Sequence, residues 1–236
     1  MTTLYAYNRD LKADLKVVGT YDYGGKTRLI YADGLEAFAA VLKQRIKDKR
    51  QNVIVVQGST GSGKSTFAIQ LARAMDPKWD LAKNYIYGVE DLKRKLADPK
   101  SSPISLFDEG SIALNSNNSM RDDDKKLVLL FDTMRSLGWT SIICIPSIKN
   151  LNKRVREYHV DYMCMCPSYP LVRGYDTRGF AQIYIRMPRD WQDPYYRMIA
   201  TLIYPPLKPS QQARYDEIKL AHQMDLIEDF ISEDEE

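Results

Sequence analysis

The sequence contains a phosphate-loop pattern in the structural setting that this pattern requires. Residues Gly58 to Ser65 read GSTGSGKS and match G-x-x-x-x-G-K-[ST]. The run before them, Asn52 to Val56 (NVIVV), is short, apolar and β-branched, which is typical of a buried parallel strand. After the loop, apolar residues recur at helical spacing from Lys64 to Met75. A glycine-rich loop between a strand and a helix limits the chain to α/β folds that bind phosphate groups.

The residue types in this loop suit a nucleoside triphosphate. Glycines let the backbone curl so that its N–H groups point at phosphate oxygens. Lys64 would reach the β- and γ-phosphates, and the Ser65 hydroxyl would be a ligand of Mg²⁺. A merely flexible loop does not explain why a lysine and a serine stand at the strand–helix junction. We therefore expect ATP and Mg²⁺ as cofactors, with the nucleotide held by Gly58, Ser59, Thr60, Gly61, Ser62, Gly63, Lys64, Ser65 and Thr66.

Two adjacent acids follow the second apolar strand. The strand is predicted over Ile104 to Phe107, and Asp108 and Glu109 come directly after it. Asp108 would hold Mg²⁺ through water, and Glu109 would activate the attacking water as general base. A dedicated base for water favours hydrolysis over phosphoryl transfer to a metabolite. A small nucleotide kinase is further disfavoured because the sequence has no recognisable lid segment.

The third predicted strand, Thr140 to Ile145, is followed by Ser147 and a basic segment. Ser147 would sense the γ-phosphate or form an ordinary Pro-Ser turn. In this segment, Lys149 to Arg156, Arg156 is our first choice for an arginine that neutralises transition-state charge. Arg154 of the same segment and Arg135, before the third strand, are weaker candidates. Contacts to nucleic-acid phosphates and a plain solvated turn are alternative interpretations of the same residues.

The remaining elements complete an α/β pattern. Strands that alternate with helices predict a mostly parallel central sheet flanked by helices. We expect further strands over 85–87, 159–166 and 180–187, and helices over 34–49, 91–96, 127–137 and 211–231, with a hairpin over 14–33. The fold prediction is thus a P-loop NTPase core with N-terminal and C-terminal β-hairpins and a C-terminal helix. The predicted division is 1–50 (hairpin and basic helix), 51–204 (ATPase core) and 205–236 (Pro-rich linker, helix and acidic tail).

Composition indicates the cellular compartment in which the protein works. The 236 residues are 44% hydrophobic and 28% charged, with no apolar run near the roughly 18 residues of a membrane span and no secretion signal at the start. Cys144, Cys164 and Cys166 cannot all pair, and we expect buried strand thiols rather than a zinc site. We therefore expect a cytoplasmic protein, in the host cytoplasm or in a virion if it is viral, with no membrane partner.

The charge is divided unevenly along the chain. Residues 225–236 hold seven acids and no base, so residues 1–224 hold 34 bases against 24 acids, a formal charge of +10. Terminal blocks of like charge are usually solvated. The alternative is that a basic body meets a polyanion and the acidic tail competes for the same surface.

The order of these motifs resembles the HerA/FtsK superfamily of P-loop ATPases, and within it viral genome-packaging ATPases and zonula-occludens-toxin-like phage proteins. The resemblance covers roughly residues 50 to 190, and Val155-Arg156 matches the family's apolar-Arg step. Where family members often carry Gln at the end of the third strand, this chain has Ser147. The resemblance implies the additional-strand, catalytic-Glu type of ATPase and a homo-oligomeric ring, usually a hexamer, that moves double-stranded DNA.

The expected function is an oligomeric ATP-driven motor that translocates or packages double-stranded DNA for a virus or mobile element. DNA contacts would come from the polar stretch Leu114 to Lys126 or from the basic face of the helix Gly34 to Arg50, although both could be plain solvated surfaces. One alternative is an ATPase that remodels or assembles a protein complex, with the acidic tail docking a protein partner. Another is a nucleotide-gated structural subunit whose hydrolysis is vestigial.

Overall fold

A computed structural model describes residues 3–98, 101–108, 131, 137–168, 179–187 and 195–233, with side chains to residue 224 except those of Val89 and Glu90. The strands are β1 (Tyr5–Asn8), β2 (Ala13–Tyr23), β3 (Lys26–Tyr31), β4 (Asn52–Gln57), β5 (Tyr85–Ile86), β6 (Ile104–Phe107), β7 (Thr140–Ile145), β8 (Tyr162–Met165), β9 (Phe180–Met187) and β10 (Tyr195–Ile203). The helices are α1 (Gly34–Lys47), α2 (Lys64–Met75), α3 (Leu81–Asn84), α4 (Val89–Ala97), α6 (Lys153–Tyr158) and α7 (Pro209–Glu233), with a 3-10 turn, η3, at Ile148–Asn150.

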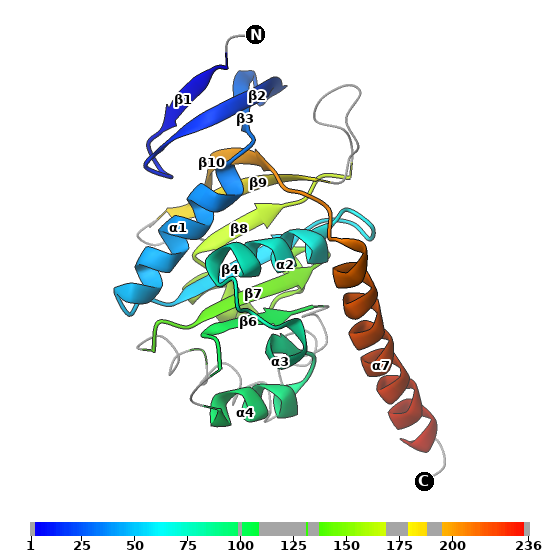
Figure 1. Cartoon of the computed structure of the whole chain (residues 1–236). Coiled ribbons are helices and arrows are strands. Elements are labelled where there is room, and N and C mark those ends of the chain that lie inside the picture. Colours follow the sequence, from blue (N-terminus) through cyan, green and yellow to red (C-terminus); the bar gives the residue numbers. More distant parts are fainter. Residues whose placement is uncertain are drawn as a thin grey trace.

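The ten described strands form one sheet in the order β1-β2-β3-β10-β9-β8-β4-β7-β6-β5 (Figure 1). Parallel pairing joins β8, β4, β7, β6 and β5 and also joins β3 to β10, whereas the pairs β1–β2, β2–β3, β9–β10 and β8–β9 are antiparallel. The predicted α/β sheet is confirmed. The predicted hairpins belong to the same sheet, which is therefore mixed.

Helices cover both faces of the parallel part of the sheet, because the strand residues alternate between two cores. On β4, Ile54 and Val56 pack in the cluster that contains α1 and α2, while Val53 and Val55 pack with residues of α4 and α6. All four are fully buried. A strand buried on both faces needs a continuous apolar run, and this explains the NVIVV sequence.

The register places three strand ends at one edge of the sheet. Along β4 and β7, Asn52 pairs with Thr140 and Gln57 with Ile145, and β6 is aligned with β7 from Ile104 to Phe107. Because all three strands run in the same direction, the glycine loop, Asp108 and the end of β7 meet at their carboxyl ends. In open α/β sheets this edge is where ligands bind.

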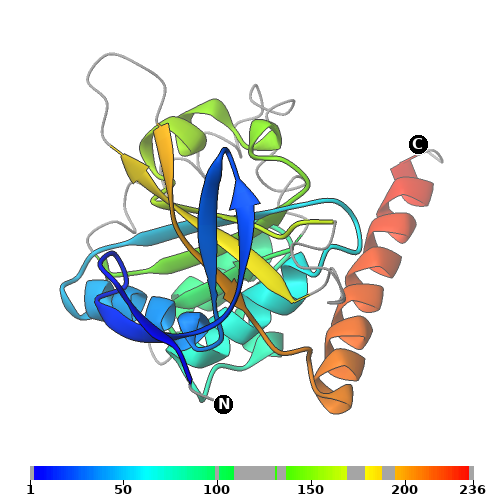
Figure 2. The same ribbon diagram turned by 90° about the horizontal axis from the view of Figure 1, so that it is seen from above.

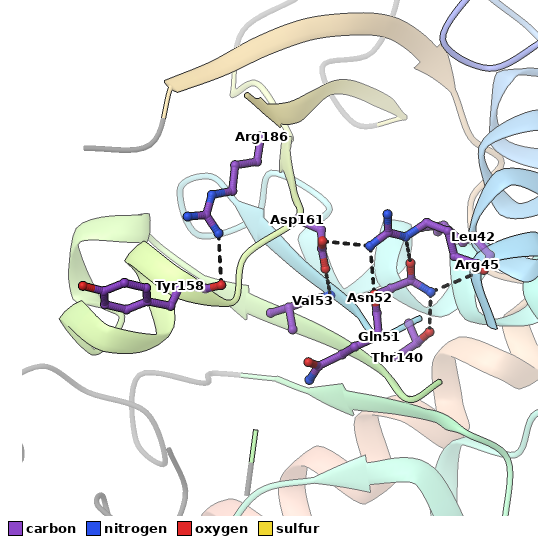
Figure 3. Close-up of polar contacts among 9 residues, drawn as sticks. All are labelled: Leu42, Arg45, Gln51, Asn52, Val53, Thr140, Tyr158, Asp161 and Arg186. Atoms are coloured by element: carbon purple, nitrogen blue, oxygen red, sulfur yellow. Dashed lines mark hydrogen bonds and ion pairs between the residues drawn. The ribbon is translucent and has the colours of Figure 1, made fainter. Parts of the chain in front are cut away.

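A buried polar network holds the opposite ends of β4 and β7 (Figure 3). Asn52 donates to the carbonyl of Leu42 (3.3 Å) and to Thr140 Oγ1 (3.0 Å), and it accepts from Arg45 Nε at 2.6 Å. Arg45 also donates to Asp161 Oδ1 at 2.8 Å, and Asp161 Oδ2 accepts from the Val53 N–H at 3.0 Å. The network ties α1 to the strand that leads into the glycine loop. Arg45, which the sequence placed on a basic solvent face, therefore points into the protein.

The sequence missed two strands, β1 and β10, and two short helices, α3 and α6. β1 adds an edge strand to the predicted hairpin, and β10 pairs with β9 along its length. The short helix α6 occupies part of the segment read as a basic turn. The predicted helix over 127–137 and the polar stretch Leu114 to Lys126 lie almost wholly outside the described residues.

Two expectations concern the whole described part of the chain. The free thiols of Cys144, Cys164 and Cys166 are all buried, as predicted, and no cluster of three His, Cys, Asp or Glu side chains suited to a metal occurs among the described residues. Among those residues, no helix has the length and apolar character to cross a membrane.

Candidate nucleotide-binding site

A cleft of about 470 Å³ lies at the carboxyl edge of β4, β6 and β7. The glycine loop and the start of α2 form one wall of the cleft, and α7 forms the other. The end of β7 forms the floor. Its lining residues are Thr60, Gly61, Gly63, Lys64, Ser65, Thr66, Asp108, Cys144, Ile145, Pro146, Gln212, Tyr215 and Lys219. The cleft therefore combines the loop and the acid that the sequence singled out with residues of a C-terminal helix.

Close backbone packing explains two of the loop glycines. Gly63 is the N-cap of α2 with φ of 89°, and a Cβ there would lie 2.5 Å from the Tyr204 hydroxyl. A Cβ on Gly58 would lie 2.5 Å from the Cys166 carbonyl. The Tyr204 hydroxyl donates to the Gly63 carbonyl at 3.1 Å, so the segment after β10 fixes the loop from outside. Only glycine fits these positions without displacing backbone or a buried tyrosine.

The Lys64 ammonium lies across its own loop. Its Nζ donates to the Ser59 carbonyl at 2.9 Å, and the contact is exposed. The start of α2 lines the cleft, and the first N–H groups of a helix have no acceptor within it. This is the arrangement in which a helix N-terminus attracts phosphate.

Ser65 and Asp108 meet although they lie on different elements. The Ser65 hydroxyl donates to Asp108 Oδ1 at 3.0 Å and to Oδ2 at 3.1 Å. Asp108 is 3% exposed, so its carboxylate faces the cleft from a buried position. A hydroxyl and a carboxylate are the hard oxygen donors that suit Mg²⁺, and the pair therefore fits that ion.

A third residue at the acid was not foreseen from sequence. Tyr215, on α7, donates a hydrogen bond to Asp108 Oδ2 at 2.6 Å. Burial, followed by the charge of Asp108, raises the pKa of Tyr215, so the phenol keeps its proton and acts as donor. The available signal was the spacing of Gln212, Tyr215 and Lys219 on one helix face. Nothing in the sequence shows that this face turns toward the phosphate loop.

Cys144 lines the floor of the cleft as an inert thiol. It is fully buried, and burial with the nearby charge of Asp108 raises its pKa well above the ordinary value. A protonated thiol at this position contributes packing and no nucleophile.

A second cavity of about 490 Å³ adjoins the loop on the side of the Pro-rich segment. Its lining includes Tyr204, Pro206, Leu207 and Gln212 together with Gly63 and Thr66 of the loop. Gln212 and the start of α2 are shared with the first cleft. The two hollows therefore meet around one end of α2, the first more polar and the second more apolar.

The other predicted site residues have varied outcomes. Glu109 and Arg135 lie outside the described residues. Arg156 is on α6, with Nη1 3.4 Å from the Lys149 carbonyl, and within the described part of the chain it is not among the residues that line either hollow.

Ser147, the candidate sensor of the γ-phosphate, caps η3 by accepting from the Lys149 N–H at 3.3 Å. A glutamine does stand at a strand end, but on β4: Gln57 Oε1 accepts from the Ile148 N–H at 3.0 Å.

A strand–glycine loop–helix unit in an α/β sheet, with a serine and an aspartate facing one cleft, is the arrangement of P-loop nucleoside triphosphatases. Residues 39–160, just over half of the chain, match the family described as Novel STAND NTPase 3. The chain belongs to this family.

Known structures give distant matches. The N-terminal domain of zonular occludens toxin from Neisseria meningitidis is 13% identical, with a TM-score of 0.40, over 67% of this chain and 96% of that one. EssC (ATPases 2 and 3) from Geobacillus thermodenitrificans is 10% identical, with a TM-score of 0.28, over 85% of this chain and 46% of that one. A search of curated proteins gives no match.

Proposed function

We propose that this chain hydrolyses ATP with Mg²⁺ in the cleft at the carboxyl edge of the sheet. The observation that supports this most is the contact of Ser65 with Asp108, because it joins the phosphate loop to the strand-end acid across 43 residues of sequence. Membership of an NTPase family is consistent with the proposal. A bound Mg²⁺ would neutralise charge on the β- and γ-phosphates.

Different residues of the chain are proposed to bind the phosphates, hold the ion and activate the water. The loop N–H groups and Lys64 bind and orient the phosphates, and Ser65 and Asp108 are proposed to hold the ion, Asp108 through water. Glu109, the next residue in the sequence, is proposed as the general base that takes a proton from the attacking water. The sheet order supports this assignment, because β7 lies between β4 and β6, as the additional-strand, catalytic-Glu type requires.

The nucleobase is proposed to occupy the second cavity. Its lining combines Pro206 and Leu207 with the ring of Tyr204, and flat apolar surface of this kind suits a purine. The two cavities share Gly63, Thr66 and Gln212, so a triphosphate bound in the first could place its base in the second.

Turnover and binding of ATP in two variants test this proposal. Lys64→Ala should lose roughly a hundredfold in nucleotide affinity, because several charge-assisted contacts to phosphate disappear together. Glu109→Gln should bind ATP normally and lose roughly a hundredfold or more in turnover. Lys83→Ala, at an exposed lysine of α3, is the control. Normal hydrolysis by Glu109→Gln would show that another group is the base.

The transition-state arginine is proposed to come from a neighbouring copy in a ring. In the described residues Arg156 stands apart from its own chain's cleft, which fits action in trans. Arg156→Ala and Lys64→Ala subunits, each inactive alone, should recover part of the turnover when mixed. Failure to recover any turnover would remove Arg156 from this role.

A second proposal is that the motor acts on double-stranded DNA, as in genome packaging. It is favoured by the formal charge of +10 on residues 1–224, of which the phosphate loop uses only Lys64. Long double-stranded DNA should stimulate ATP turnover at moderate salt, and binding should weaken as salt rises. Deletion of residues 225–236 should tighten DNA binding if the acidic tail competes for the same surface. Turnover that is indifferent to DNA, with no salt-dependent binding, would favour a protein substrate or a nucleotide-gated structural role.

A further inference from the structure

Among the side chains of α7 that the structure describes, up to residue 224, those that pack against the body lie on one face of the helix. Tyr215, Ile218 and His222 lie on that face, spaced three and four residues apart, and Tyr215 is only 8% exposed. The His222 ring stacks on Tyr85 and Tyr87, with centroids 5.4 and 5.0 Å away. On other faces Leu220 and Met224 are 59% and 50% exposed. Both views show α7 standing along one side of the body (Figures 1 and 2).

The start of α7 is fixed beside the phosphate loop. Gln70, on α2, donates to the carbonyls of Pro205 and Pro206 at 3.1 and 2.9 Å, and Tyr204 donates to Gly63. Residues 204–206 are thus held against the same helix that carries Ser65. A displacement of α7 that keeps these contacts would be a rotation about its first turn, with the far end moving most.

The Tyr215 hydroxyl is hydrogen-bonded to Asp108, the carboxylate that is proposed to hold the cation. A carboxylate offers about four acceptor positions. Ser65 contacts both oxygens of Asp108, and the Tyr215 hydroxyl takes a further position on Oδ2. The phenol is a neutral donor at this buried acid, in the place where Asp108 would otherwise accept from the hydration shell of an ion.

Resting on the proposed function, we propose that Tyr215 is a positioning residue that gates the cation site, and that release of Asp108 by Tyr215 couples binding of Mg²⁺ and nucleotide to a rotation of α7. In the structure described, α7 is docked and Tyr215 holds Asp108. If Asp108 accepted instead from the water shell of a bound ion, the Tyr215 hydroxyl would lose its partner while still buried. An unpaired buried hydroxyl is unfavourable, so the helix face that carries it is pushed outward.

The coupling has a direction that can be measured. If the Tyr215 hydroxyl competes for Asp108, Tyr215→Phe should lower the Mg²⁺ concentration needed for half-maximal binding of a fluorescent ATP analogue by roughly tenfold. With EDTA present no cation competes for Asp108, so the variant should change nucleotide binding less than it does with Mg²⁺ present. Tyr158→Phe is the matched control, because Tyr158 is 70% exposed on α6. An unchanged or higher Mg²⁺ requirement in Tyr215→Phe would overturn the gate.

A second variant acts on the docking of α7 without touching Asp108. His222→Ala removes the ring that stacks on Tyr85 and Tyr87. It should lower the Mg²⁺ requirement in the same direction as Tyr215→Phe, because a loosened α7 holds Tyr215 less firmly against the acid. A purely local role of the hydroxyl would leave the Mg²⁺ requirement of His222→Ala at the wild-type value, and that result would exclude the coupling.

Helix movement can be observed directly with two spin labels. Cysteines introduced at exposed Lys43 on α1 and Leu220 on α7 can be labelled selectively, because the three native thiols are buried. Mg²⁺ with a non-hydrolysable ATP analogue should shift the label-to-label distance in the wild type, and the shift should be smaller in Tyr215→Phe, which has no hydroxyl to leave unpaired. The rotation would be refuted if the distance between the two labels were the same with and without ligand in the wild type and in Tyr215→Phe.

These results separate the inference from the function on which it rests. If the wild-type protein binds no nucleotide, the ATPase proposal fails and the gate fails with it. If nucleotide binds and Lys64→Ala abolishes binding, but Tyr215→Phe and His222→Ala behave like the wild type, only the gate is wrong.

Discussion

Tyr215 and Asp108 are 107 residues apart in the sequence and are joined by a 2.6 Å hydrogen bond at the edge of the nucleotide cleft. The contact makes the last helix of the chain a wall of the site that the glycine loop begins. It also places the segment that precedes the acidic tail within reach of the group proposed to sense the cation. The chemistry of the cleft and the position of α7 are therefore expected to be linked.

The first prediction concerns the nucleobase cavity. Leu207→Ala removes apolar surface from the cavity wall and should weaken ATP binding roughly three- to tenfold. Binding of inorganic tripolyphosphate, which has no base, should stay unchanged. Leu220→Ala on the exposed side of α7 is the control, and melting temperatures show whether Leu207→Ala remains folded. Equal losses for ATP and tripolyphosphate would place the base elsewhere.

The second prediction concerns the network behind the phosphate-loop strand (Figure 3). Asn52 is fully buried, and Asn52→Ala would remove its hydrogen bonds with Arg45 Nε, the Leu42 carbonyl and Thr140 Oγ1. The free energy of unfolding should fall by about 2–4 kcal/mol, measured by urea denaturation. Thr27→Ala, which removes an exposed hydrogen bond to Asp22, should cost less than about 0.5 kcal/mol. Similar losses in the two variants would mean that the network contributes little.

Local pattern was enough to predict the elements that carry the loop. The bounds of α2, β6 and β7 agree with the sequence prediction, because a fully buried strand or an amphipathic helix has a strong local signature. The strand β10 was missed although it is nine residues long. Its identity as a strand depends on pairing with β9, a contact that no periodicity within 195–203 reveals.

The residues of the site also fall into two groups, those that the sequence could predict and those that it could not. Ser65 and Asp108 could be paired in advance because motif spacing and parallel strands bring them to one edge. Tyr215 and Tyr204 could not, since each reaches the loop through the path of the chain after β10. In the sequence, Arg45 looks like one of several solvated bases on α1. Its contact with Asp161 depends on tertiary structure, because the two residues are 116 positions apart.

The third prediction concerns alkaline pH. Burial raises the pKa values of the Cys144 and Cys164 thiols and brings that of Cys166 to about 12. In the unfolded chain a thiol ionises near pH 8.5, so above that pH the unfolded state binds fewer protons than the folded state. The contribution of these thiols to stability is complete below about pH 8.5 and declines as pH rises toward 12. Cys164→Ala and Cys166→Ala should flatten the fall in unfolding free energy between pH 8.5 and 10, and an unchanged slope would count against protonated thiols.

The fourth prediction isolates a buried lysine whose effect on stability has the opposite sign. Lys95 is 3% exposed, and its Nζ donates to Asn84 Oδ1 and to the carbonyls of Ser102 and Ile104, at 2.9 and 2.8 Å for the last two. Burial lowers its pKa to about 7, against about 10.4 in an unfolded chain. Between these values the unfolded state binds more protons than the folded state, so this group makes the free energy of unfolding rise with pH.

Comparison with Lys95→Met separates that rise from the thiol effect, because all three cysteines remain in both proteins. From pH 7 to pH 9 the wild type should gain about 2–3 kcal/mol in unfolding free energy relative to Lys95→Met, measured by urea denaturation. Lys83→Met, at an exposed lysine of α3, should follow the wild type at every pH. Parallel stability curves for the wild type and Lys95→Met would show that Lys95 stays charged, and that the oxygens around it solvate the ammonium as well as water does.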